Sequence, residues 1–116
     1  MEQTHFQITR GCLCLMLPED LGGQDTSMIK DALLKHIHQH HRTRCVIFDC
    51  TKLRLLDQRD LDDLMELVTC IKLMGKSVGF CSIGATLAAV LVTLKMDPSE
   101  FHFGQSLDDV IRIIDH

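Results

Sequence analysis

Short apolar runs alternate with longer amphipathic segments along this chain, and this alternation restricts its fold more than any other feature. The apolar runs have the length of strands, whereas the segments between them repeat apolar residues every three or four positions, as helices do. Alternating strands and helices fold as a mainly parallel sheet covered by helices. We therefore predict one α/β domain spanning residues 1–116, with a mixed, mainly parallel β-sheet flanked by α-helices. Its element order is β-β-α-β-α-β-α-β-α.

The expected strands are short, and the second is apolar at nearly every position. Cys12, Cys14 and Met16 fall on one side of it and the intervening leucines on the other, so we expect burial on both faces. The strands are expected at residues 6–9, 12–17, 45–49, 77–81 and 101–103, the last at an edge.

Polar capping residues and glycine mark the expected helix ends. The first helix is expected to be capped by Asp25, Thr26 or Ser27 and to end near His40. The second follows Asp57 and stops at Gly75. A last helix starts at Ser106 and buries Leu107, Val110, Ile111 and Ile114.

The third expected helix, within residues 83–94, is apolar on all sides. A helix of this kind is either core or presents a face to a partner or to a second copy. The run has about twelve residues, and a membrane span needs about twenty, so we expect no transmembrane segment.

Four aspartates crowd the start of the second helix: Asp57, Asp60, Asp62 and Asp63. Asp57 and Asp60 are spaced as in a capping box, and the positive end of the helix dipole favours carboxylates there. Successive helical positions are about 100° apart, so the carboxylates fan around the axis instead of converging on one ion. We expect helix capping and an acidic surface, with no metal site.

Histidines gather at residues 36–41, and His36 and His40 have an i, i+4 spacing that can chelate zinc. A third ligand is not evident. Because histidine is also favoured at a helix carboxyl end, metal binding by this patch stays open.

Six cysteines lie mostly within apolar runs, without any Cys-x-x-Cys spacing. We expect them to be free, buried thiols in a cytoplasmic protein without a signal peptide. A net charge of −4 and the absence of Trp and Tyr disfavour nucleic-acid binding. No nucleophile, nucleotide-binding or dinucleotide-binding motif occurs, so we expect neither an enzyme nor a cofactor.

Three short motifs stand in a characteristic order. Asp49-Cys50-Thr51 follows a hydrophobic strand, Leu55-Leu56-Asp57 precedes a helix, and Lys72-Leu73-Met74-Gly75 ends that helix. In this order the chain resembles the STAS domain, the fold of anti-sigma-factor antagonists, from Phe6 to about Ile114. The helix end resembles that of stressosome scaffold proteins of the RsbS type.

The resemblance implies a regulatory surface comprising Asp49, Thr51 and the helix start, and protein partners: a kinase-like anti-sigma factor, other STAS proteins or a second copy. In these antagonists a phosphorylated Ser or Thr follows the aspartate at the helix start. Gln58 stands there instead, followed by Arg59 and Asp60, and an amide cannot take a phosphate. Thr51 and Ser82 are alternative modification sites. A second interpretation is a cytoplasmic STAS subunit of a lipid-type ABC transport complex.

Overall fold

The computed structural model describes residues 6–115, apart from the side chains of residues 23–25 and 100. Its five-stranded sheet has the order β1-β2-β3-β4-β5. The first pair is antiparallel and the others are parallel. This confirms the predicted α/β class and element order. The strands are β1 (Phe6–Thr9), β2 (Cys12–Met16), β3 (Cys45–Asp49), β4 (Ser77–Cys81) and β5 (His102–Gly104).

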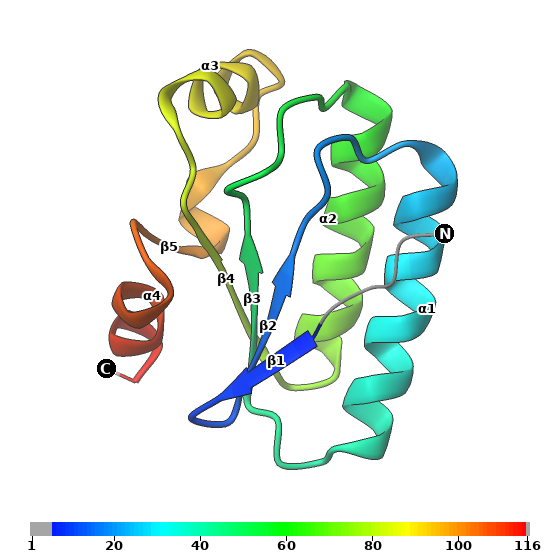
Figure 1. Ribbon diagram of the computed structural model, residues 1–116, viewed down its shortest axis with the longest axis vertical. Coiled ribbons are helices and arrows are strands. Elements are labelled where there is room, and N and C mark those ends of the chain that lie inside the picture. Colours follow the sequence, from blue (N-terminus) through cyan, green and yellow to red (C-terminus); the bar gives the residue numbers. More distant parts are fainter. Residues whose placement is uncertain (1–5, 116) are drawn as a thin grey trace.

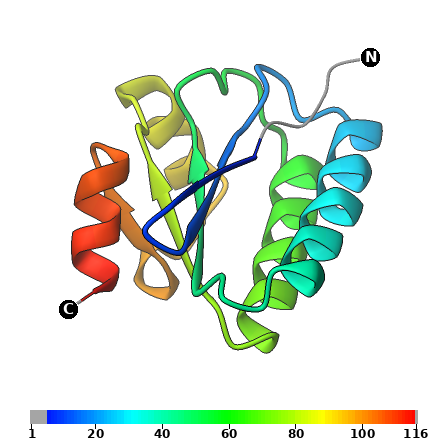
Figure 2. The same cartoon turned by 60° about the horizontal axis from the view of Figure 1, so that its bottom comes forward.

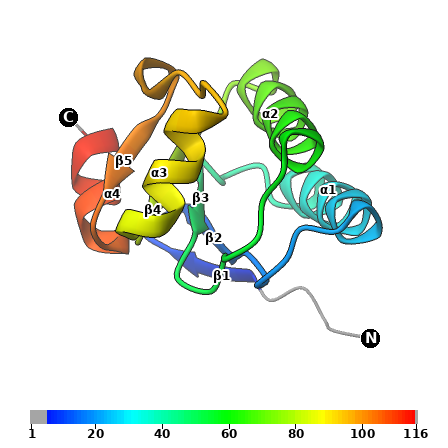
Figure 3. The same ribbon diagram turned by 90° about the horizontal axis from the view of Figure 1, so that it is seen from above.

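Helices cover both faces of the sheet (Figures 1 and 2). The long helices α1 (Gly23–Gln39) and α2 (Gln58–Leu73) lie side by side on one face, and α4 (Leu107–Ile114) lies on the other. Helix α3 (Ala85–Thr93) sits over the end of the sheet from which the loops leading into α1 and α2 emerge, as Figure 3 shows from above. A 3-10 turn (Pro98–Glu100) precedes β5.

Two apolar cores result, one on each face of the sheet. Leu13 and Leu15 of β2 belong to the larger core with α1 and α2, whereas Cys12 and Cys14 belong to the smaller core with α4. The predicted alternation of β2 is thus confirmed, with one exception: Met16 at the end of the strand is 43% exposed.

The fourth helix lies close against the sheet because two strand positions there are glycines. A Cβ at Gly79 would clash with Val110 Cγ1, and a Cβ at Gly104 would lie 2.9 Å from Val110 Cγ2. Val110 is completely buried, so it occupies the space that two side chains would otherwise fill.

The end of α2 and the start of α4 agree with the boundaries predicted from the sequence. Gly75 has φ +83°, the left-handed conformation in which glycine ends helices, directly after the C-cap of α2. Ser106 Oγ accepts from the Asp109 N–H at 3.2 Å at the start of α4, as predicted.

The predicted start of α1 is wrong. The helix begins at Gly23, and no described side chain caps it; the side chain of Asp25 lies outside the described part. Thr26 N–H donates to Gly22 O at 3.4 Å, and Thr26 itself is buried within the first turns. Gly22 occupies the N-cap position, where glycine is tolerated, so the helix starts earlier than the polar residues suggest.

The expectation that all cysteines are free is also wrong: Cys12 and Cys45 form a disulfide. These residues face each other in the register of the parallel strands β2 and β3, with Cα atoms 4.7 Å apart. Thirty-three positions separate them in sequence, and nothing in their local spacing reveals that register. Cys14, Cys50, Cys70 and Cys81 are free thiols.

Helix α3 is less buried than a core helix would be. Leu87 alone of its nine residues, all of them described, is buried, and Val92 is 76% exposed. The helix anchors to the larger core through Leu87, while most of its uncharged surface faces outward. No helix of the described part is both long and apolar enough to cross a membrane.

Candidate functional site

The predicted regulatory residues lie where the parallel strands end, at the top of Figure 1. Asp49 is the last residue of β3, and the chain then runs through residues 50–57 into the start of α2. Loops at the carboxyl ends of parallel strands are common sites of function because the sheet holds them rigidly while leaving them accessible.

The start of α2 is a capping box, as the spacing predicted. Asp57 precedes the helix with extended backbone, and its Oδ1 accepts from the Asp60 N–H at 2.8 Å. In return, Asp60 Oδ2 accepts from the Asp57 N–H at 3.4 Å. Two backbone donors that the helix leaves unpaired are therefore satisfied, and the position of the next residue, Gln58, is well defined.

The four aspartates do not share one environment. Asp60 is only 8% exposed, whereas Asp57 and Asp62 are exposed and Asp63 is half-buried. In the part of the chain that the structure describes, no group of three or more His, Cys, Asp or Glu residues is placed to hold a metal ion.

Burial raises the pKa of the Asp60 carboxyl. The Asp57 N–H that donates to it acts in the opposite direction, while the charges of Asp57 and Asp20 raise the pKa further. The hydrogen bond that Asp60 accepts from the Asp57 N–H nevertheless gives this buried carboxyl a capping role.

Asp20 belongs to this acidic surface, and the sequence interpretation missed it. The loop after β2 runs beside the loop before α2: Glu19 O accepts from the N–H groups of Arg54 and Leu55, at 2.9 and 3.1 Å. Asp20 itself forms an isolated parallel bridge with Leu55. A contact between two irregular loops leaves no periodic signal in a sequence.

Gln58, the first residue of α2, is exposed and bonded within its own helix. Its Nε2 donates to Asp62 Oδ1 at 2.9 Å. Both residues also line a groove of about 210 Å³ between α2 and residues 94–97. Met65, Met96 and Phe101 add apolar surface to this groove, so the amide lies at the rim of a mixed polar and apolar depression.

Asp49 and Thr51 form a separate turn after β3. Asp49 Oδ1 accepts from both the backbone N–H and the hydroxyl of Thr51, at 2.9 and 2.5 Å. No hydrogen bond or ion pair within residues 6–115 is seen to join this turn to the α2 start. Ser82, with φ +64°, donates to Gln105 O at 3.4 Å after β4.

The histidine patch is a stack at the carboxyl end of α1. The rings of His36 and His40 lie parallel with centroids 4.0 Å apart, and His36 also contacts the Phe6 ring at 5.2 Å. Burial, and then the neighbouring His40, lower the pKa of His36. This patch lies at the opposite end of α1 from the acidic surface, so the two are separate features.

No protein-family model matches the chain, and no curated protein matches it significantly in sequence. Solved structures do match it. A variant of RsbS from Moorella thermoacetica superposes with a TM-score of 0.82 over 98% of this chain and 96% of that chain, at 17% identity. The fold is that of the STAS domain.

Two further structures show how widely this STAS fold is used. A putative anti-sigma factor antagonist from Thermotoga maritima matches with a TM-score of 0.79, at 11% identity, over 97% of this chain and 95% of that chain. The murine anion transporter Solute Carrier 26 family member A9 matches with a TM-score of 0.74, at 13% identity, over 94% of this chain and 18% of that chain.

Proposed function

We propose that this chain is a non-enzymatic regulatory or scaffold protein of bacterial signalling, located in the cytoplasm. It binds a kinase-like anti-sigma factor or other STAS proteins through the start of α2. The observation that carries the proposal is the position of Gln58: it directly follows the N-cap aspartate, where the resemblance places a phosphorylated residue, and it is exposed at the rim of a groove.

The chemistry of this position explains why the substitution matters. A phosphate there would add about −1.5 to −2 charge at a helix amino terminus. The amide of Gln58 is neutral and is bonded to Asp62. Residue 58 therefore cannot gain charge by phosphorylation, and partner exchange or protein concentration sets the signalling state of the surface instead.

Charge reversal tests the proposed binding surface. The wild-type chain is used to capture partners from cells of its source, and the recovered partner is then titrated against variants in a calorimeter. Asp62→Lys should weaken binding by at least about tenfold, because a rim charge of the interface is reversed. Asp31→Lys, an exposed aspartate on α1, is the matched control and should bind as the wild type does. Equal affinity of both variants would refute the assignment of the surface.

The identity of the partner separates this proposal from the alternative, a cytoplasmic STAS subunit of a lipid-type ABC transport complex. The match to one part of a membrane anion transporter supports this alternative, because the same fold occurs there as part of a transport protein. Recovery of an ATPase or a permease as the main partner would support the transport role. Recovery of a STAS protein or a kinase-like protein would support the signalling role.

Self-association through α3 is a further part of the proposal. The helix carries no charged residue, and Val92 on its outer surface is 76% exposed. Because the chain has a net charge of −4, two copies approach most readily at an uncharged surface. Light scattering over a concentration series should show dimers or larger species in the wild type and fewer in Val92→Asp. Leu73→Asp, also at an exposed apolar residue, is the control.

A further inference from the structure

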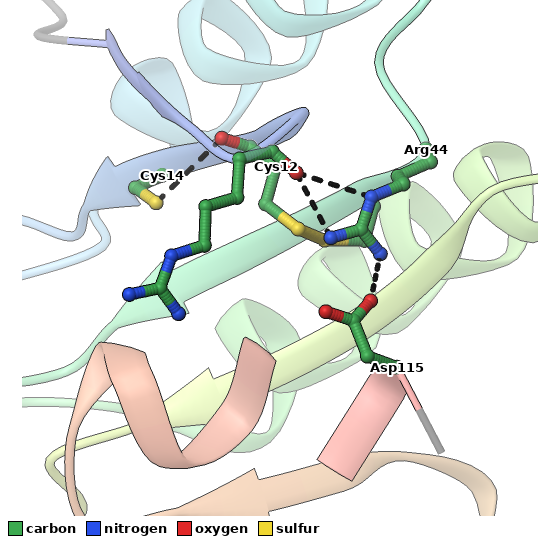
Figure 4. The surroundings of a disulfide bond; sticks show 6 residues. Cys12, Cys14, Arg44 and Asp115 are labelled. Atoms are coloured by element: carbon green, nitrogen blue, oxygen red, sulfur yellow. Dashed lines mark hydrogen bonds and ion pairs between the residues drawn. A yellow bond between two sulfur atoms is a disulfide. The ribbon is translucent and has the colours of Figure 1, made fainter. Parts of the chain in front are cut away.

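The Cys12–Cys45 disulfide lies under the carboxyl end of α4. Both cysteines are completely buried, and they share the smaller core with Val110 and Ile111 of that helix. The bond links the start of β2 to the start of β3, the end of the sheet farthest from the start of α2 (Figures 1 and 4). A reagent in solution therefore reaches either sulfur only after the structure above it opens.

Arg44 connects the same two chain segments to α4. It directly precedes Cys45, and its Nε and Nη2 donate to Arg10 O at 3.1 and 2.9 Å. Its Nη1 donates to Asp115 Oδ1, at the C-cap of α4, as Figure 4 shows. The turn before Cys12, the residue before Cys45 and the end of α4 thus meet at one guanidinium.

The backbone strengthens this junction. Arg44 N–H donates to Gly11 O at 2.9 Å, within a turn where Arg10 and Gly11 both have positive φ. The disulfide and Arg44 therefore both join the start of β2 to the start of β3. The disulfide does so covalently inside the core, and Arg44 does so by hydrogen bonds at the surface of the protein.

The neighbouring thiols do not compete for the disulfide. Cys14 and Cys81 lie in the same core, but burial raises the pKa of Cys14 to about 11, with Cys81 and Asp49 adding to the shift. Since the thiolate is the form that attacks a disulfide, the raised pKa makes attack by Cys14 slow at neutral pH. Burial also raises the pKa of the Cys81 thiol, which disfavours its attack on the bond in the same way.

We propose that the Cys12–Cys45 pair is a redox site whose state controls the docking of α4, with a dithiol as its reductant. A thiolate of the dithiol attacks one sulfur and forms a mixed disulfide, while the other cysteine leaves and takes up a proton. The second thiol of the reductant then closes a ring and releases the first cysteine. The protein gains two electrons and two protons as two thiols, and the dithiol becomes a cyclic disulfide.

Reduction removes the covalent link between β2 and β3, so the two strands on which α4 packs are less constrained, while apolar packing and Arg44 still hold the carboxyl end of the helix. Helix α4 therefore opens more often in the reduced protein. The start of α2 lies across the sheet and against the other core, so its capping box is unchanged by the reaction (Figure 3). The redox site thus works independently of the proposed partner surface. An experiment can therefore refute either proposal without refuting the other.

Hydrogen exchange of purified protein tests this. Oxidised and dithiothreitol-reduced wild type are compared, and alkylation followed by intact mass counts two additional thiols after reduction. We expect the amides of residues 107–114 to exchange about tenfold faster in the reduced protein, with residues 58–64 unchanged. Cys14→Ser is the matched control from the same core and should respond to the reductant as the wild type does.

Two variants separate the steps. Asp115→Asn removes a charged partner of Arg44 and should speed the reduction by dithiothreitol about threefold or more, because α4 opens more easily. Cys12→Ser should exchange like the reduced wild type, with or without reductant. Equal α4 exchange in both redox states would overturn the proposal. So would an unchanged thiol count after reduction, or reduction only at the rate of global unfolding.

Discussion

The side-chain amide of Gln58 donates to Asp62 Oδ1 at 2.9 Å, which ties the first residue of α2 to a carboxylate one turn further along. A serine at this position would be too short to make the same contact and would present a hydroxyl instead. The residue that replaces the expected phosphate acceptor is thus accommodated by the helix itself, in a position fixed by the capping box before it.

Gln58→Ser should create a phosphorylation site. Incubated with ATP and the kinase-like partner of the proposed signalling role, the variant should gain the mass of one phosphate at residue 58. Gln39→Ser, an exposed residue at the end of α1, should gain none. Phosphate found by peptide mapping on Thr51 or Ser82 of the wild type would instead identify that residue as the phosphorylation site.

Asp57→Ala should destabilise the protein by about 1 kcal/mol, since the Asp60 N–H loses its acceptor at the helix start. The matched control is Asp62→Ala, which removes the exposed contact with Gln58 and should cost only about 0.2–0.5 kcal/mol. Urea unfolding measures both values. Equal losses would show that the carboxylates act through charge alone and not through the capping box.

Asp60→Asn should change how stability depends on pH. A carboxyl whose pKa is raised on folding binds its proton more tightly in the folded state. Its contribution to stability is therefore greatest at low pH and falls as the pH rises from the ordinary pKa of aspartate through the raised one. The unfolding free energy of the variant minus that of the wild type should therefore increase between about pH 3 and pH 7. Asparagine can still accept from the Asp57 N–H, so identical pH profiles would contradict the burial argument.

Gly79→Ala should destabilise the protein by about 1–3 kcal/mol, because the new methyl group meets Val110 Cγ1 in a packed core. The control is the same change in a Val110→Ala background, where the clash is absent and the additional loss should stay below about 0.5 kcal/mol. Additive losses, measured by urea unfolding, would mean that α4 does not depend on the missing side chain.

Local sequence patterns predicted most of the helices and strands of the fold. Helix α2 was predicted from its start to its end because Asp57, Asp60 and Gly75 act on their immediate neighbours. The start of α1 was misjudged for the converse reason, since Gly22 allows a helix to begin without a capping side chain. Helix α3 is apolar on every side, so the sequence could not tell that Leu87 alone would be buried.

Features that depend on register or on contacts between loops could not be predicted. Cys12 and Cys45 are ordinary apolar-strand cysteines until β2 and β3 align them. Asp20 joins the acidic surface only because its loop hydrogen-bonds to residues 54 and 55. These contacts form only when segments far apart in the sequence come together in the tertiary structure. A local sequence pattern describes one helix or strand at a time and does not predict them.

The strands are arranged in the sheet in the order in which a ribosome synthesises them. Each new strand can dock on the outer edge of the one before it, and no later strand has to be inserted between two earlier ones. The face covered by α1 and α2 can therefore assemble while the last part of the chain is still being made, and α4 closes the opposite face last. Until then Cys12 and Cys45 are aligned but uncovered, so reagents in solution can reach the two sulfur atoms that α4 later shields.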